Sequence, residues 1–346
     1  DANGEVDVTV NSTEAGTAEV DATCAVSVGG ITVNVDTAGY GAWTVSNEKT
    51  WVDARISITQ SDTNKVGDPH TFTIHVEEND GSGWADADGE TVVPSITSGP
   101  AGASITSTGP YTTDANGEVD VTVNSTEAGT AEVDATCAVS VGGITVNVDT
   151  AGYGATTVSN EKTWVDARIS ITQTDTNKVG DPHTFTIHVE ENDGTGWADA
   201  DGETVVPSIT SGPAGASITS TGPYTTDADG EVDVTVNSTE AGTAEVDATC
   251  AVSVGGITVN VDTAGYGAWT VSNEKTWVDA RISITQTDTN KVGDPHTYTI
   301  HVEENDGTGW ADADGETVVP GITSGPAGAS ITSTGPYTTA ANGEVD

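Results

Sequence analysis

Residues 114–150 read DANGEVDVTVNSTEAGTAEVDATCAVSVGGITVNVDT, and this stretch decides the fold. Valine alternates with polar residues over 119–123, and the same two-residue period returns over 133–141 and 144–148. A period of two places apolar side chains on one face of a β-strand and polar side chains on the other. The Gly-Gly pair between the last two runs predicts a tight turn, so these runs should form a hairpin.

The stretch belongs to a repeat. DANGEVDVTVNSTEAG begins at Asp1 and again at Asp114, returns with one change at Asp227, and the repeat starts once more at Ala340, which gives a unit of 113 residues. The first two copies differ at three positions, which are Trp43/Thr156, Ser61/Thr174 and Ser82/Thr195. A unit of this length is large enough to fold as an independent domain, unlike a solenoid repeat.

Each unit is expected to be an all-β sandwich. Further strands are predicted from ARISIT (167–172), HTFTIHV (183–189), ETVVPSI (203–209) and the short segment 216–218. Glycine is abundant, at 41 residues, methionine is absent, and no segment has a helical pattern. Seven or so short strands separated by turns predict an immunoglobulin-like β-sandwich, repeated in a linear array.

The segment TTDANGEVDVTVNSTEAGTAEVDAT, residues 112–136, resembles bacterial immunoglobulin-like repeats of the invasin and intimin type. The pattern is an Asp-Ala-Asn-Gly turn, an alternating strand, a Ser/Thr-x-x-Gly turn and another alternating strand. The likeness is strongest over the last half of each unit, while the first half follows the family only in outline. It implies a sandwich fold and the setting of surface adhesins, fibres and cell-envelope proteins, and it implies no catalytic residues.

The strand order of that family predicts the domain boundaries. Residues 1–53 would be the C-terminal half of one immunoglobulin-like domain, 54–166 and 167–279 two complete domains, and 280–346 the N-terminal half of another. Two interpretations of the split ends remain open. The chain is a window of a longer repeat protein, which we favour, or a protomer whose halves complete each other between subunits in an open head-to-tail assembly.

The charge is strongly acidic. The chain has 54 acidic and 9 basic residues, for a formal net charge of −45. Such a chain repels nucleic acids and anionic membrane surfaces, so neither is expected as a partner. No segment suggests membrane insertion or a signal peptide. Repulsion between acidic domains suggests bound cations, with a merely solvated surface as the alternative.

The acidic loop EENDGTGWADADGE, residues 190–203, is the candidate cation site, and it recurs at 77–90 and 303–316. Calcium binds six to eight oxygens, which carboxylates clustered on a turn can supply. The spacing is not that of an EF-hand. The predicted calcium ligands are Asp80, Asp86, Asp88, Asp193, Asp199, Asp201, Asp306, Asp312 and Asp314.

The sandwich topology suggests that the calcium site lies near a domain junction. In that arrangement Asp166, Asp227 and Asp229 would join Asp193, Asp199 and Asp201, beside the linker that contains Glu161, and calcium would stiffen a stalk. The alternative is that Asp, Asn and Gly serve only as turn formers, with no ion present.

Each repeat has a single cysteine, Cys24, Cys137 or Cys250, so no bridge can form within a domain. Cys137 falls on the apolar face of its strand and is expected to be a small core residue; an intermolecular disulfide is the minority alternative. His183 and His188 are five residues apart and should point to opposite faces of a strand, which does not suit a metal site.

The remaining candidates are modification and contact sites. The sequence Asn-Ser-Thr marks predicted N-glycosylation sites at Asn11, Asn124 and Asn237. Trp164 is expected to pack at the linker and Trp197 lies in the acidic loop. The position of Trp43 and Trp269 accepts Thr156, so it is interpreted as a fibre contact or as neutral surface. Lys162 or Lys178 could form an isopeptide bond with an Asn or Asp that the sequence does not locate.

Catalysis is not expected, because identical active sites along a stalk would be unusual. The preferred function is a structural segment of an extracellular filament, stalk or sheath on a prokaryotic cell surface, with self-association into fibres, head to tail or laterally. The alternative is the stalk of a surface adhesin whose binding head lies outside these residues. A third class, an accessory binding module of an enzyme, would show carbohydrate affinity in an isolated repeat.

Overall fold

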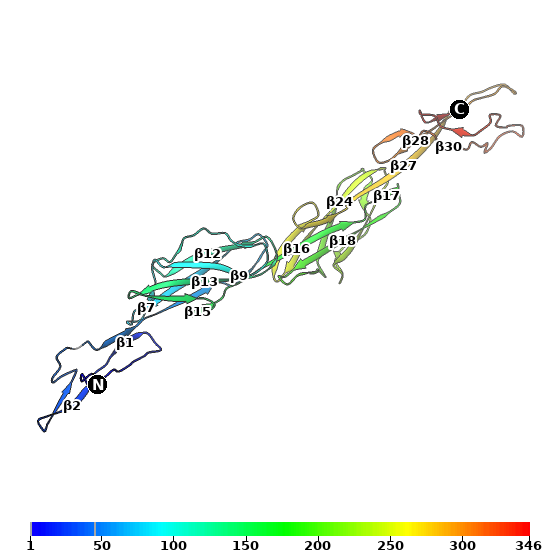
Figure 1. Ribbon diagram of the computed structural model, residues 1–346. Coiled ribbons are helices and arrows are strands. Elements are labelled where there is room, and N and C mark those ends of the chain that lie inside the picture. Colours follow the sequence, from blue (N-terminus) through cyan, green and yellow to red (C-terminus); the bar gives the residue numbers. More distant parts are fainter. Residues whose placement is uncertain (1, 45) are drawn as a thin grey trace. The chain divides into compact units, whose positions relative to one another are not determined.

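The computed structural model describes residues 2–44 and 46–346, and over these residues the chain forms strands and turns without a helix (Figure 1). It divides into two compact units. One comprises residues 1–166 with 193–196, and the other comprises residues 167–192 with 197–346. Each unit contains one complete two-sheet sandwich, so the predicted all-β, immunoglobulin-like fold is confirmed.

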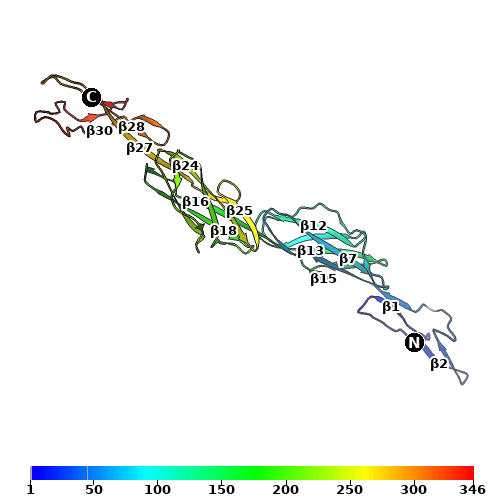
Figure 2. The same cartoon turned by 180° about the vertical axis from the view of Figure 1, so that it is seen from behind.

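In the first unit, one sheet has the strand order β10-β12-β7-β5-β15, and β8 pairs with β7. β15 runs parallel to β5, whereas the other pairs are antiparallel. Figure 2 shows β7, β12 and β15 from the side opposite to Figure 1. The strands of this sheet are β5 Asp53–Thr59, β7 His70–Asn79, β8 Trp84–Asp86, β10 Ala103–Ile105, β12 Glu118–Ser125 and β15 Ala155–Val158.

The facing sheet has the order β11-β9-β13-β16 in this unit, with β14 paired to β13 and β6 paired to β16. Here β6 runs parallel to β16. The strands are β6 Asp62–Lys65, β9 Thr91–Ser98, β11 Tyr111–Thr112, β13 Gly129–Val141, β14 Ile144–Asp149 and β16 Glu161–Thr172, of which residues 161–166 belong to this unit.

The first and last parts of the domain each contribute to both sheets. The chain leaves β5 in one sheet and enters β6 in the other through Gln60, whose φ of 87° lies in the left-handed region. It likewise passes from β15, beside β5, to β16, beside β6. The beginning and the end of the domain are therefore paired with each other in both sheets.

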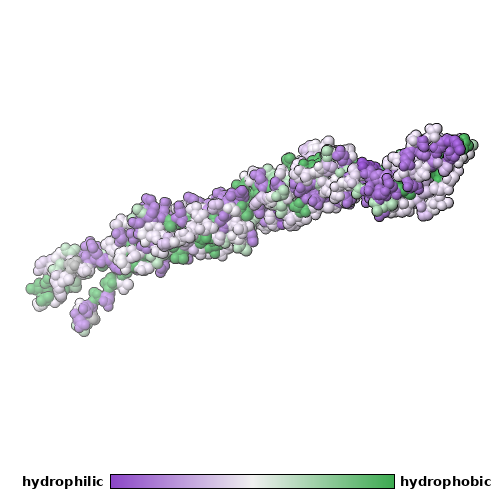
Figure 3. Space-filling model, turned by 90° about the horizontal axis from the view of Figure 1, so that it is seen from above, coloured by the Kyte–Doolittle hydropathy of each residue, from purple (hydrophilic) through white to green (hydrophobic). Residues whose placement is uncertain are grey.

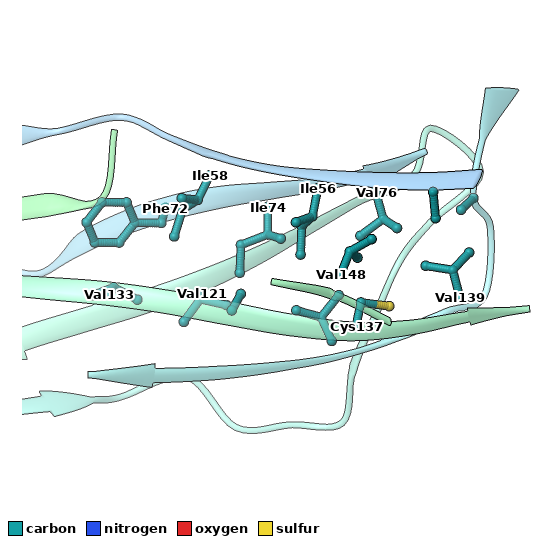
Figure 4. Packing of buried hydrophobic residues seen from close by; sticks show 14 of the residues in the cluster. Ile56, Ile58, Phe72, Ile74, Val76, Val121, Val133, Cys137, Val139 and Val148 are labelled. Atoms are coloured by element: carbon teal, nitrogen blue, oxygen red, sulfur yellow. The ribbon is translucent and has the colours of Figure 1, made fainter. Parts of the chain in front are cut away.

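The core lies between the two sheets and follows from the alternation in the sequence. Figure 4 shows Phe72, Ile74 and Cys137 among the side chains that fill this space. The inward residues are fully or almost fully buried, and they are Ala54, Ile56, Ile58, Phe72, Ile74, Val76, Ala87, Val92, Val121, Val123, Ala131, Val133, Ala135, Cys137, Val139, Val141, Val148 and Trp164. The strand faces predicted over 119–123 and 133–141 are confirmed.

Two turns show why glycine stands where it does. Gly142 and Gly143 have φ values of 57° and 81° and join β13 to β14 in the predicted hairpin, in which Val141 pairs with Ile144. In the Asp-Ala-Asn-Gly turn, Gly117 has φ 71°, and a Cβ there would clash with the carbonyl oxygen of Val76. This glycine is needed for both its conformation and the close approach of the two backbones.

A buried carboxylate on β13, that of Asp134, links the neighbouring segments of the facing sheet by hydrogen bonds. Asp134 accepts hydrogen bonds from the hydroxyls of Thr97 and Thr150, at 3.0 Å each, and from the side-chain amide of Asn160 at 3.1 Å. Thr150 in turn accepts the backbone N–H of Ala135 at 2.8 Å. Because every donor in this set reaches an acceptor, the carboxylate is buried at little cost.

The second unit repeats the sandwich. One sheet contains β16, β18, β19, β21, β23 and β26, and the facing sheet contains β17, β20, β22, β24, β25 and β27. The added strands are β17 Asp175–Lys178, β18 His183–Asn192, β19 Trp197–Asp199, β20 Thr204–Ser211, β21 Ala216–Ile218, β22 Tyr224–Thr225, β23 Glu231–Ser238, β24 Gly242–Val254, β25 Ile257–Asp262, β26 Ala268–Val271 and β27 Glu274–Thr285.

The segments outside the complete sandwiches also form strands, but their apolar side chains are largely exposed. They contain β1 Gly16–Glu19, β2 Thr23–Val28, β3 Ile31–Asp36 and β4 Glu48–Trp51, and then β28 Thr299–Asn305, β29 Trp310–Asp312, β30 Thr317–Val318, β31 Tyr337–Thr338 and β32 Glu344–Val345. Ile282 and Ile284 are 65% and 62% exposed, whereas the equivalent Ile56 and Ile58 are fully buried. On the face that Figure 3 shows, apolar residues lie scattered between hydrophilic ones.

We expect Phe72→Ala to lower the free energy of unfolding of the first sandwich by about 3–5 kcal/mol, because it removes a fully buried ring from the core. The second sandwich keeps its own Phe185, so denaturant unfolding followed by fluorescence should separate into two steps. Phe185→Ala is the matched variant and should move the other step. A single unfolding step at the wild-type midpoint would contradict this assignment of the core.

Candidate functional site

In each acidic loop, a glutamate and a tryptophan both contact one arginine of a neighbouring strand. We call these three residues the arginine clasp. Arg168, on β16, donates two hydrogen bonds to Glu190 on β18, from Nε at 2.6 Å and from Nη2 at 2.8 Å. Its guanidinium also lies over the ring of Trp197, with Cζ 4.2 Å from the centroid. Arg55 and Arg281 form the same contacts in their repeats. A bidentate carboxylate pair combined with cation–π stacking fixes the position of the loop tryptophan.

The second complete repeat adds another aromatic ring to this clasp. Trp269, on β26, also stacks on this arginine, with Arg168 Cζ 3.8 Å from the ring centroid. In the first repeat this position is Thr156, whose hydroxyl hydrogen-bonds the carbonyl of Ile56 instead. The tryptophan therefore stacks within its own domain, a contact that neither sequence interpretation of this position included.

The predicted calcium ligands perform separate local tasks. Asp86, Asp199 and Asp312 each lie 2.8–2.9 Å from Nε2 of a histidine, which is His75, His188 or His301. Asp80, Asp193 and Asp306 each accept hydrogen bonds from the residue two positions later, Ser82, Thr195 or Thr308, and these bonds lower the pKa of each carboxyl. Asp88, Asp201 and Asp314 are exposed in the following turn.

Among the other carboxylates of the predicted junction site, Asp227 has local partners. Asp227 accepts the backbone N–H groups of Asp229 and Glu231 at 3.0 and 3.1 Å, which closes its turn. Asp166 falls in the first compact unit and Asp227 in the second. Over the described residues, no three His, Cys, Asp or Glu side chains are grouped so that they could hold a metal ion. Calcium binding stays a prediction from composition and loop sequence.

The two histidines of a repeat lie in different surroundings. His188 contacts the acidic loop through Asp199, whereas His183 packs edge-on against Phe185 with 4.7 Å between ring centroids. His183 Nε2 is buried without a hydrogen-bond partner. Burial, together with the positive charge of Lys275, lowers the pKa of His183 below its ordinary value. The two side chains thus point to opposite faces of β18, as expected from their spacing of five residues.

The structure distinguishes the two lysine candidates. Lys178 is exposed and lies 3.9 Å from Asp181, as an ordinary surface ion pair. Lys162 is completely buried beside Trp164, and the indole N–H of Trp164 donates to the carbonyl of Asp68 at 3.0 Å. Burial lowers the pKa of Lys162 to about 8. Of the two, Lys162 has the environment of a chemically unusual amine.

The prediction that the cysteine is a core residue is confirmed in the two complete sandwiches. Cys137 and Cys250 are buried free thiols, and Cys24 is an exposed free thiol. Burial, with a smaller contribution from a nearby glutamate, raises the pKa of Cys137 and of Cys250 to about 11. The two core thiols are therefore unreactive in the folded domain.

Two of the predicted glycosylation sites, Asn124 in β12 and Asn237 in β23, stand near the ends of strands, whereas Asn11 precedes the first strand. Asn124 donates from its side-chain amide to the carbonyl of Gly67, and Asn237 donates in the same way to Gly180, at 2.9 Å in both. The Asn11 side chain accepts the backbone N–H of Ser12. Glycosylation of these residues stays a prediction.

The described residues include no helix with the length and apolar character needed to cross a bilayer.

Comparisons with known proteins give matches only among solved structures. No family model matches the chain, and no curated protein matches it. A two-domain fragment of intimin matches at 20% identity over 61% of this chain and 96% of the fragment, with a TM-score of 0.22. The Escherichia coli adhesin FdeC matches at 16% identity over 84% and 86% of the two chains, with a TM-score of 0.27. Invasin, a bacterial integrin-binding protein, matches at 16% over 75% and 58%, with a TM-score of 0.24.

The chain is a tandem immunoglobulin-like β-sandwich protein, as its strand pairing and core define. Intimin and invasin, whose repeats residues 112–136 resemble, are among these matched structures. Because identities and TM-scores are low, the fold assignment rests on the sheets and the core, and the function is a separate question.

We expect iodoacetamide to alkylate Cys24 of the monomeric chain, at low protein concentration, rapidly near neutral pH and to leave Cys137 and Cys250 unmodified. Both core thiols are buried, and with pKa values of about 11 they form thiolate only as the pH rises toward that value. Intact mass should show one label on the folded chain and three after unfolding in denaturant. Three labels on the folded chain at neutral pH would contradict the buried placement.

Proposed function

We propose that this chain is a structural repeat segment of an extracellular filament, stalk or sheath on a prokaryotic cell surface. The observation that carries this proposal is the repetition itself. The first two copies differ at three positions, and both complete sandwiches bury the same residues, such as Ile56 and Ile169 or Phe72 and Phe185. Copies that preserve a core and have no specialised member suit a repeated structural element.

The differences between copies support the same proposal. Trp43, Thr156 and Trp269 occupy one position, and the structure places Thr156 and Trp269 on the surface beside the arginine clasp. Ser61/Thr174 and Ser82/Thr195 keep a hydroxyl. Catalysis is not part of this proposal, because it would require a specialised set of groups rather than interchangeable domains.

The net charge of −45 fits a segment exposed to solvent outside the cell. Charge of one sign keeps such a chain soluble and opposes nonspecific contact with nucleic acids and anionic lipid. These properties are useful for a component that stands away from a cell envelope.

The alternative is the stalk of a surface adhesin. Among the matched structures, a fragment of intimin is solved in complex with the intimin-binding domain of the translocated intimin receptor, at 17% identity to this chain. A binding role for this chain would require a head domain outside these residues, whereas the filament proposal requires only repeats.

Immunogold electron microscopy of the producing cells, with an antibody raised against this chain, distinguishes these proposals. A filament or sheath component should give label at regular spacing along extended surface structures. An adhesin stalk should give isolated label at the envelope, and the antibody should reduce attachment of cells to a surface. Label confined to the cell interior would contradict both.

We further propose that copies of this chain associate head to tail, which is the second of the two interpretations of the split ends; in the first, further repeats of one longer chain cover the same faces. The exposed Ile282 and Ile284 correspond to Ile56 and Ile58, which are fully buried in the complete sandwich. Val6, Val8 and Val28 are likewise exposed, at 86%, 70% and 61%, although the equivalent Val119 is partly buried and Val121 and Val141 are fully buried. Strands from a second copy would cover these faces by sheet completion, with the apolar effect as the driving force.

Light scattering at increasing protein concentration tests the association. The molar mass should rise above the 34.9 kDa of one chain, in steps of one chain. The double variant Ile282→Asp, Ile284→Asp should stay monomeric, since a buried carboxylate opposes sheet completion. Thr285→Asp, on the same strand, is the matched control and should associate like the wild type. A constant molar mass of one chain at all concentrations would overturn the proposal.

A further inference from the structure

Each complete sandwich contains a lysine whose ammonium group is buried without a hydrogen bond. Lys162 on β16 and Lys275 on β27 are both 0% exposed, and in both the Nζ atom has no hydrogen-bond partner. An unpaired buried ammonium is costly, and such groups in a native fold require an explanation. The same arrangement occurs in both compact units, so it is a property of the repeat.

The nearest carboxylate is held opposite the lysine by strand pairing. In the parallel pair of β6 and β16, Asp62 is the partner of Lys162, and its Oδ2 lies 4.0 Å from Nζ. In the second unit Asp175 is the partner of Lys275, at 3.9 Å. Backbone register therefore keeps each amine beside one carboxyl group. The aspartate side chain is 60% exposed, which gives a released water molecule a path to solvent.

A histidine with a free ring nitrogen completes the group. Nε2 of His70, on β7, is buried without a partner, and so is Nε2 of His183 in the second unit. Burial, and after it the charge of Lys162, lowers the pKa of His70, and burial with the charge of Lys275 does the same for His183, so each histidine lies within the electrostatic influence of its lysine. A neutral imidazole with a free nitrogen can accept a proton and pass it on.

We propose that Lys162 is joined to Asp62, and Lys275 to Asp175, by an isopeptide bond that the folded domain forms without another protein. Nζ attacks Cγ of the aspartate, the new C–N bond forms, and one C–O bond breaks. The ammonium nitrogen gives up two protons, which leave with the departing carboxyl oxygen as water, and the histidine relays a proton between them. Ammonium and carboxylate become a neutral amide and water, so atoms and charge balance without an oxidant or co-reactant.

The fold favours this reaction for two reasons. Holding the reacting groups side by side replaces an encounter in solution, and well-oriented intramolecular reactions gain effective molarities of about 10⁵–10⁸ M. The amide also removes an ammonium charge from the interior, where it is poorly solvated. This inference is independent of the proposed function, because it concerns one domain and not its setting.

The chain supplies its own controls. Lys49 is the equivalent lysine near the start of this sequence, but no aspartate is paired opposite it, and it is exposed. Asp288 is the equivalent aspartate of the last repeat, and this sequence contains no lysine at the corresponding later position. One bond is therefore expected in each of the two complete sandwiches and none in the rest of this sequence.

Intact mass spectrometry of the unfolded, reduced chain is the test. The wild type should be lighter than its sequence mass by two water molecules. Lys162→Arg and Asp62→Ala should each restore one of them, and Lys178→Arg, which removes the exposed lysine, should restore none. Protease digestion should yield a branched peptide that links Asp62 to Lys162. In His70→Ala, the bond in the first sandwich should form more slowly, seen as a mixture of masses that resolves with time.

An unbranched digest and an intact mass equal to the sequence mass would overturn the proposal and leave an ion pair. Succinimide formation at an Asp-Gly sequence also removes water, but its peptides are unbranched and Lys162→Arg would not restore its mass; that outcome likewise overturns the proposal. Because the deciding measurement is made on the wild-type chain, it does not depend on whether any variant folds.

Discussion

The structure depends on the burial of one layer of small and branched side chains between two sheets. Every second residue of β5, β7, β12 and β13 has to enter this layer, and the residue between has to face outward. A shift of one residue in any of these strands would exchange the two faces. The period-two alternation thus sets strand register, and register in turn places the polar groups that the domain buries.

Local patterns were enough to predict the strands and the hairpin, because those features depend on neighbouring residues. Val121, Val139 and Cys137 lie on the faces that the alternation assigns to them, and the Gly142–Gly143 turn joins the strands expected. The crossing at Gln60 and the parallel pairing of β6 with β16 could not be predicted in this way. They bring together residues about a hundred positions apart, and local periodicity carries no information on which distant strand is a partner.

The chemistry of the site was harder to predict than the fold. The many acidic residues suggested a cation site, yet Asp80 accepts a hydrogen bond within its own turn and Asp86 pairs with a histidine. The clasp on Arg168 was missed because its partners, Glu190, Trp197 and Trp269, are scattered along the sequence. The available signal was that arginine occurs once in each 113-residue repeat unit, at Arg55, Arg168 and Arg281, in a chain with only 9 basic residues. Lys162 could be named from sequence, but only the sandwich shows that it is buried and which carboxyl faces it.

The parallel pairing of β6 with β16 has a mechanical consequence. β6 stands near the entry of the domain and β16 at its exit, so tension applied through the two ends pulls these strands past each other along their length. Their hydrogen bonds are then loaded in shear, all at once, and not peeled open one after another. Resistance to shear is determined by the rate of unfolding under load and not by equilibrium stability. A domain with this geometry is suited to bear tension even when its small apolar core gives it only ordinary stability.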